Sequence, residues 1–164
     1  MQIRDAVPED ASAACEVLRR SISELCGADH RNDPEILTRW LANKTPEIVG
    51  SWIIEPGNSV LLAVDDDSIL AVGAVTDAGE ITLNYVSPDA RFRGVSRAML
   101  TVLEARALER DTDRCTLLST ETAHRLYRSA GYIDDGALQR KFGTTSSYPM
   151  SKRLTGQAGD RGQR

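Results

Sequence analysis

The stretch from residue 80 to residue 110 constrains the fold more than any other part of the chain. It opens with an alternating run over residues 80–86 (EITLNYV), a period-two pattern that predicts a β-strand with Ile81, Leu83 and Tyr85 on one face. A turn with one proline and two arginines follows, and residues 94–110, which include a third arginine at position 97, then carry apolar side chains at helical spacing. A strand, a basic turn and a helix in direct succession predict an α/β unit in which the turn is available to a ligand.

This turn has the chemistry of a phosphate site. Backbone N–H groups in the first turn of a helix lack partners, and the helix dipole is positive there, so such an end binds phosphate. Gly94 would let a bulky diphosphate approach the backbone, and Ser96 is small for the same reason. Arg91, Arg93 and Arg97 would add charge at the mouth of the site, although solvated surface charge is an alternative for all three.

The remaining sequence patterns predict the succession of helices and strands in the rest of the chain. Helical spacing predicts three helices before residue 57, with Gly27 ending the first of them. Two β-rich runs, 60–64 and 69–75, flank the turn DDDS and predict a hairpin. A strand, a helix over residues 121–130 with Gly131 as its C-cap, and closing strands follow residue 110. This order predicts an α/β (α+β) fold with a mixed sheet flanked by helices.

Composition limits the function classes. The 164 residues suit one domain, and 41% hydrophobic with 27% charged residues is ordinary for a soluble globular protein. No apolar run is long enough to cross a bilayer, and the N-terminus has no signal-peptide pattern, so we expect a cytoplasmic protein. The net charge of −4 gives no global field for nucleic acid or anionic membranes. Three scattered cysteines predict neither a disulfide framework nor a zinc site.

The basic turn resembles the acyl-CoA signature of the GNAT superfamily of N-acetyltransferases, V-x-P-x-x-[RQ]-x-x-G-x-[GA]. Val86, Pro88, Arg91 and Gly94 match this signature, and Ser96 departs from it at the last position, where serine is still small. A second family pattern, A-x-x-[LF]-Y-x-x-x-G-[FY], is matched in full by AHRLYRSAGY. Together, in this order, the two motifs are strong evidence for the family.

The resemblance spans about residues 2–154 and implies a single GNAT-like acetyltransferase domain over residues 1–154. Residues 155–164 are polar and are expected to form a mobile tail. The implied fold is a mixed, mostly antiparallel central sheet of six to seven strands flanked by about four to five helices. The implied co-substrate is acetyl-CoA, with no metal. Family members are often dimers, so the resemblance also implies a homodimer.

The same resemblance assigns cofactor contacts by motif position. The backbone of residues 84–86 should pair with the pantetheine arm as an added strand would. Thr120 stands where many relatives carry an asparagine that touches pantetheine. The turn and the helix start should surround the pyrophosphate. The cofactor-binding residues expected in this way are Asn84, Tyr85, Val86, Arg91, Phe92, Arg93, Gly94, Val95, Ser96, Arg97 and Thr120.

Two residues are candidates for the chemistry. The resemblance makes Tyr127 the acid toward the CoA sulfur, because a phenol is neutral at pH 7 and can donate to a thiolate. The alternative is a core tyrosine on the apolar stripe of its helix. Glu80 matches the general-base glutamate of some family members, with a solvated hairpin glutamate as its alternative. Unbroken alternation along residues 80–86 would turn Tyr85 away from Glu80.

A polar cluster at Asp29, His30, Arg31 and Asp33 lies between the first two predicted helices. His30 could help to deprotonate an amine, but helix capping is the favoured interpretation of the cluster. The chain is therefore predicted to move an acetyl group to a primary amine of a small molecule or a protein, without nucleic-acid or membrane partners. The alternative is a non-catalytic acyl-CoA-binding or sensor domain of the same fold.

Overall fold

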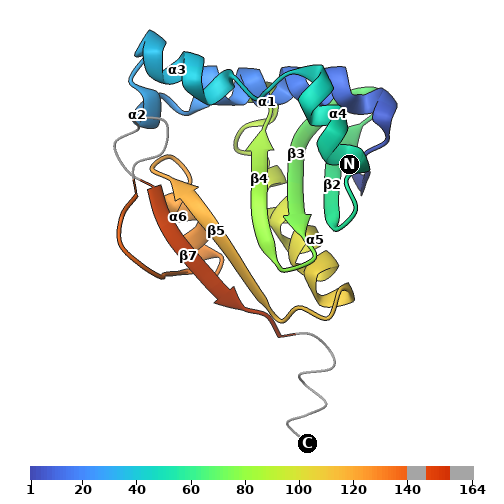
Figure 1. The fold of residues 1–164 in the computed structure, drawn as a ribbon, viewed down its shortest axis with the longest axis vertical. Helices are drawn as coiled ribbons and strands as arrows, with labels where there is room; N and C mark the ends of the chain where they lie inside the picture. The colour runs from blue at the N-terminus through green and yellow to red at the C-terminus, as the bar shows by residue number, and fades with distance from the viewer. Residues whose placement is uncertain (140–146, 156–164) are drawn as a thin grey trace, which may run out of the picture.

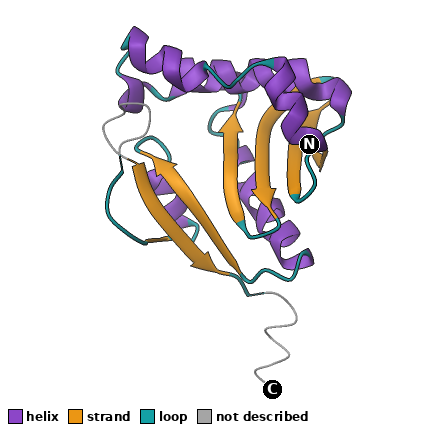
Figure 2. Cartoon of the chain, viewed as in Figure 1, coloured by secondary structure: helices purple, strands orange, loops and turns teal. Residues whose placement is uncertain are grey.

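The computed structural model describes residues 1–139 and 147–155, and these form one seven-stranded sheet with helices on both of its faces (Figures 1 and 2). The strand order is β1-β2-β3-β4-β5-β7-β6, and β4 and β5 are the parallel neighbours among otherwise antiparallel pairs. This confirms the mixed, mostly antiparallel sheet of six to seven strands. The strands are β1 (Gln2–Asp5), β2 (Asn58–Asp65), β3 (Ser68–Thr76), β4 (Glu80–Val86), β5 (Arg114–Thr120), β6 (Ile133–Asp134) and β7 (Ser147–Arg153).

Six α-helices and two short 3₁₀ turns lie in the described part of the chain. Their starts follow the sequence signals: the Asp33 carboxylate accepts the backbone N–H groups of Glu35 and Ile36, and the Thr45 hydroxyl accepts that of Ile48. The elements are η1 (Pro8–Asp10), α1 (Ala11–Leu25), α2 (Gly27–His30), α3 (Pro34–Leu41), α4 (Pro46–Ile54), η2 (Pro88–Ala90), α5 (Val95–Glu109) and α6 (His124–Ser129).

Two helix boundaries differ from the sequence prediction. Gly27 does not close the first helix, because α1 ends at Leu25 and Gly27 begins the extra helix α2. Helix α6 begins at His124 instead of residue 121, because the preceding residues form a turn that Asp29 holds by hydrogen bonds. The second boundary depends on hydrogen bonds between segments that are far apart in the sequence, which local propensity does not report.

Hydrophobic side chains on the two faces of the sheet form two cores. Strand side chains alternate between faces, so Leu61 and Ala63 of β2 pack on the α5 side, while Val60 and Leu62 pack with α1 and α4. All three cysteines are buried and free. The arrangement leaves the ends of β4 and β5 between the two helical layers (Figure 1).

A β-bulge in β4 overturns the predicted alternation. Ala74 of β3 pairs with Leu83, but Val75 pairs with Ile81, so Thr82 is the extra residue. Ile81 therefore packs on the α5 side, whereas Leu83 and Tyr85 pack on the α1 side. The prediction that these three side chains share one face was wrong, and so was the prediction that Tyr85 turns away from Glu80.

Strands β4 and β5 diverge soon after they pair. Their register contains two residue pairs, Glu80 with Thr116 and Ile81 with Leu117. Beyond that point β4 continues alongside β3, and β5 continues alongside β7 (Figure 1). The facing backbone edges of residues 82–86 and 118–120 are thus available to a ligand. Backbone N–H and C=O groups need partners, so an extended ligand can add here as a strand does.

The expected tail over residues 155–164 lies outside the described residues, apart from Thr155. Among the helices of the described ranges, none combines the length and the apolar character needed to cross a membrane.

Candidate active site

A groove of about 370 Å³ opens where β4 and β5 diverge. Strand β4 and the loop into α5 form one side, and the turn from β5 to α6 forms the other, with the C-terminal end of α1 above them. Ten of the expected cofactor-binding residues line it: Asn84, Tyr85, Val86, Arg91, Phe92, Gly94, Val95, Ser96, Arg97 and Thr120. Arg93 is absent from this lining, and its guanidinium lies 3.6 Å from the exposed Asp65 carboxylate.

Gly94 lies where the groove meets the start of α5. It is the N-cap of α5, with a φ of 74° and no capping side chain, so the first N–H groups of the helix have no partner within it. A Cβ added to Gly94 would have no heavy atom within 4 Å, so the space beside it is open. Exposed backbone N–H groups facing open space suit a diphosphate.

The arginines around this loop are exposed, as expected if they are solvated surface charges. The Arg91 guanidinium lies 4.5 Å from the centroid of the Phe92 ring, and Arg97 donates to the Ser129 hydroxyl. Phe92 is itself 92% exposed and has a φ of 62°. Because water screens exposed charges, these guanidinium groups act on the groove more weakly than buried charges would.

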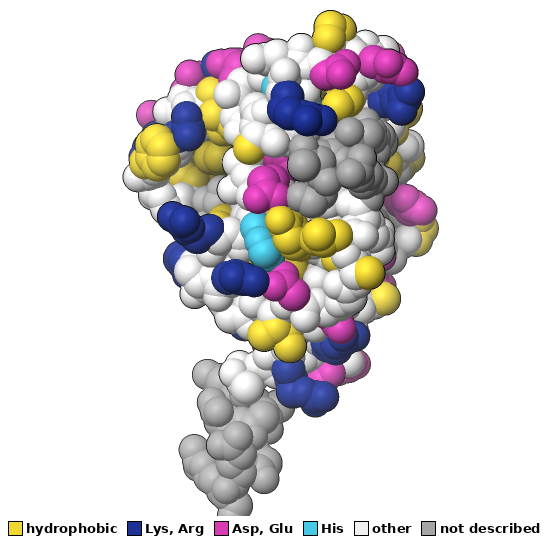
Figure 3. Space-filling view, turned by 90° about the vertical axis from the view of Figure 1, so that its left-hand side faces the viewer, with side chains coloured by type: hydrophobic (Ala, Val, Ile, Leu, Met, Phe, Trp, Pro, Cys, Tyr) yellow, Lys and Arg dark blue, Asp and Glu magenta, His cyan; other side chains and the backbone are white. Residues whose placement is uncertain are grey.

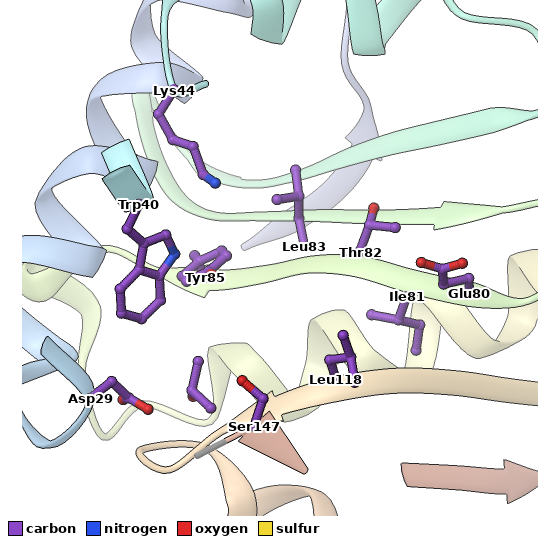
Figure 4. A pocket seen from close by; sticks show the side chains of 11 residues that line it. Asp29, Trp40, Lys44, Glu80, Ile81, Thr82, Leu83, Tyr85, Leu118 and Ser147 are labelled. Carbon is purple, nitrogen blue, oxygen red and sulfur yellow. The ribbon is translucent and has the colours of Figure 1, made fainter. Parts of the chain in front are cut away.

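A second cavity, of about 120 Å³, lies beside β4 and is partly lined by the same residues (Figure 4). Tyr85 and Thr120 line both the cavity and the groove, so the two spaces adjoin at the opening of the sheet. Glu80 reaches the cavity from the start of β4, and the Lys44 side chain extends toward it from the loop before α4 (Figure 4). The bulge at Thr82 brings Glu80 and Tyr85 to the same cavity.

Tyr85 and Trp40 form the aromatic part of this cavity. Burial raises the pKa of Tyr85 above its ordinary value, and a hydrogen bond with Trp40 opposes this rise. The phenol is therefore neutral near pH 7. Sequence reasoning missed the Tyr85 side chain because it assumed regular alternation. It missed Trp40 and Lys44 because neither the helix that carries Trp40 nor the loop that carries Lys44 had a catalytic pattern.

Tyr127 lies next to the groove but belongs to the core on the α5 side. Its side chain is 6% exposed, and its ring meets Tyr132 edge to face with centroids 5.7 Å apart. Burial raises the pKa of Tyr127 to about 12, and a hydrogen bond with Asn84 acts in the opposite direction. Tyr127 is therefore a core residue that also lies beside a residue lining the groove.

Asp29 and His30 serve the structure. The buried Asp29 carboxylate accepts the N–H groups of Glu121 and Thr122 at 2.7 and 3.3 Å, and the Thr122 hydroxyl at 2.6 Å. His30 Nε2 donates to the Ile22 carbonyl at 2.9 Å, because a carbonyl can only accept. His30 Nδ1 accepts the Asn32 N–H at 2.9 Å, so neither ring nitrogen keeps a free lone pair to act as a base.

No group of three or more His, Cys, Asp or Glu side chains in residues 1–139 and 147–155 is placed to hold a metal ion. On the face drawn in Figure 3, basic, acidic and hydrophobic side chains are interspersed outside the grey area, without one large patch of a single kind.

The diverging strands and the open helix end define an α/β protein with a groove for an extended ligand. The model of the Acetyltransferase (GNAT) domain family matches residues 32–154, three quarters of the chain. The chain therefore belongs to the GNAT acetyltransferase family, as its two sequence motifs predicted. No curated protein matches it at a significant level.

Solved structures share this fold. A GCN5-related N-acetyltransferase from Rhodopseudomonas palustris is 22% identical with a TM-score of 0.82, covering 93% of this chain and 95% of that one. PaiA N-acetyltransferase from Thermoplasma acidophilum, solved in complex with coenzyme A, is 17% identical with a TM-score of 0.80, covering 93% and 98%. A GCN5-related N-acetyltransferase from Kribbella flavida is 25% identical with a TM-score of 0.70, covering 93% and 97%.

Proposed function

We propose that this chain is an acetyl-CoA-dependent N-acetyltransferase that moves an acetyl group directly to a primary amine of a small molecule or a protein. The observation that carries the proposal is the groove at the β4–β5 divergence, which ends at the open N-terminus of α5. Its strand edge suits the amides of a pantetheine arm, and its helix end suits a diphosphate. Acetyl-CoA carries both groups on one molecule.

The proposed base lies at the cavity, and the proposed acid lies beside the groove. Glu80, at the cavity, would accept a proton from the acceptor amine, directly or through a water. The neutral nitrogen then bonds to the thioester carbonyl carbon, the carbon–sulfur bond breaks, and the nitrogen loses its second proton to water. Tyr127, beside the groove, would donate its phenolic proton to the leaving thiolate and recover a proton from solvent. The amide and free CoA are the products.

Glu80→Gln is expected to lower kcat/KM about tenfold at pH 7, because the glutamine cannot accept the amine proton. The loss should shrink as the pH approaches the pKa of the acceptor amine, about 10 for an alkyl amine, because that amine then loses its proton unaided. Rate profiles of both proteins from pH 6 to pH 10 measure this. A constant loss across the range would remove Glu80 from the role of base.

The acceptor cavity has its own electrostatic preference. The buried Lys44 side chain extends toward it (Figure 4), and Glu80 lines the same space together with Asp29, whose carboxylate is hydrogen-bonded to the turn at residues 121–122. An acceptor that carries an acidic group beside its amine would meet opposite charges at both groups. We expect Lys44→Met to raise KM about tenfold for an amino acid but less than twofold for the corresponding amino-acid amide. Equal changes for the two acceptors would contradict this preference.

The direct test of the function has two parts. Calorimetry with acetyl-CoA and with CoA measures binding, and a screen of amines with acetyl-CoA, followed by thiol release, measures turnover. Binding together with amine-dependent thiol release is the expected result. Absence of binding would overturn the proposal. Binding without turnover on any small amine or peptide amino group would instead favour an acyl-CoA-binding or sensor domain.

A further inference from the structure

Phe92, at the mouth of the groove, combines two features that the stability of the fold does not explain. It is 92% exposed, more than any other exposed large hydrophobic residue in the described part of the chain, so its ring gains little from burial. Its backbone has a φ of 62°, a left-handed conformation that is rare and strained for a bulky side chain. Backbone strain of this kind is concentrated at ligand clamps and active sites.

The neighbouring Arg91 supports the exposed ring. Its guanidinium carbon lies 4.5 Å from the centroid of the Phe92 ring, within the range of a cation stacked on an aromatic face. The guanidinium covers one face of the ring, and the high exposure of Phe92 leaves the opposite face to solvent. An aromatic face that is supported on one side and open on the other can stack with a second planar group.

The position of Phe92 along the groove indicates which part of a ligand it meets. Phe92 lines the groove two residues before Gly94, the N-cap of α5. Two residues span at most about 7 Å of chain, so the ring is close to the proposed diphosphate site. In CoA, the pantetheine arm and the adenosine are attached to opposite ends of the diphosphate. With the arm along the β4 edge, the adenosine extends beyond the start of α5, within reach of the Phe92 ring.

We propose that Phe92 is the stacking platform for the adenine of CoA and that it thereby favours an acyl donor that carries a nucleotide. This inference rests on the proposed function. A base presents a flat π face, so stacking holds the adenine without a hydrogen bond to its edge. An acyl group on a phosphopantetheine arm without a nucleotide, as on a carrier protein, would lack this contact. Phe92 binds the donor and takes no part in the proton transfers.

The test measures Kd by calorimetry for phosphopantetheine, dephospho-CoA and CoA, which differ at the adenosine end. The wild-type protein should bind phosphopantetheine at least about tenfold more weakly than dephospho-CoA, because one stacked base is lost. Phe92→Asn removes the ring and keeps a residue that tolerates a positive φ. It should raise the Kd for CoA and for dephospho-CoA about tenfold and that for phosphopantetheine less than twofold.

Phe92→Trp is the matched variant, because it keeps an aromatic face at the same position. Its Kd for CoA should stay within about threefold of the wild-type value, since indole stacks on a base as phenyl does. Phe92→Asn should melt at or above the wild-type temperature, because it removes a bulky side chain from a strained position. Equal losses of CoA affinity in both variants would show that the ring does not stack with the base.

Other results would also overturn the inference and leave the proposed function intact. An equal loss of phosphopantetheine affinity in Phe92→Asn would show that the loop, and not a base contact, is disturbed. A loss for CoA without one for dephospho-CoA would show that Phe92 acts on the ribose phosphate. Unchanged affinity for all three ligands would exclude Phe92 from donor binding. Failure of the wild-type protein to bind any of the three would instead mark failure of the proposed function.

Discussion

Tyr127→Phe is expected to lower kcat at least about a hundredfold while leaving the Kd for acetyl-CoA within a factor of two. The substitution removes one hydroxyl and keeps the ring, so the packing against Tyr132 remains. Without a donor beside the sulfur, the thiolate must leave without a proton. Steady-state kinetics with the best acceptor, together with calorimetry, measure the two quantities separately.

Tyr132→Phe is the matched control for this experiment. Its ring is also buried and touches Tyr127, but its hydroxyl donates to Glu104 at 2.9 Å, on the core side. The control should change thermal stability more than kcat. Equal effects of the two substitutions on kcat, or unchanged turnover of Tyr127→Phe, would return Tyr127 to a purely structural role.

The pH dependence of the wild-type enzyme gives a further check on Tyr127. Its pKa is raised to about 12 by burial, so the phenol keeps its proton at every pH below about 11. The kcat profile should therefore show no alkaline decline caused by Tyr127 up to that point. A decline near pH 10 that disappears in Tyr127→Phe would show that the phenol ionises at its ordinary value.

Gly94→Asn is expected to raise the Kd for CoA about a hundredfold, equivalent to losing two charge-assisted hydrogen bonds of about 1.5 kcal/mol each. Asparagine tolerates a positive φ better than most residues, so the backbone at Gly94 can keep its conformation. A Cβ at Gly94 would meet no protein atom within 4 Å. The new Cβ therefore adds no contact with the protein and points into space that a ligand would occupy, and calorimetry with CoA measures the loss.

Gly57→Asn is the matched control, because Gly57 has a similar φ of 79° and its Cβ would meet only the Asp77 side chain, at 3.8 Å. It lies before β2, outside the groove lining. Both variants should melt within a few degrees of each other, while only Gly94→Asn loses CoA affinity. Unchanged affinity in Gly94→Asn would show that the diphosphate does not approach the start of α5.

Local sequence was sufficient to locate the proposed anion site. The order of strand, turn and helix over residues 80–110 can be predicted from the spacing within that stretch, and it places Gly94 at the start of α5. The second motif placed Tyr127 on α6 for the same reason. Each assignment depended on a contiguous run in which spacing alone sets which groups share a turn or a face.

The tertiary structure decided which residues of distant segments face one another. The bulge at Thr82 placed Tyr85 in the cavity with Glu80, and no alternating pattern reveals a single extra residue. Asp29 holds the turn at Glu121, 92 positions away, and the divergence of β4 from β5 follows from how each strand pairs with its other neighbour. Sequence spacing determines local geometry, whereas contacts between distant segments depend on the packing of the whole sheet and its two helical layers.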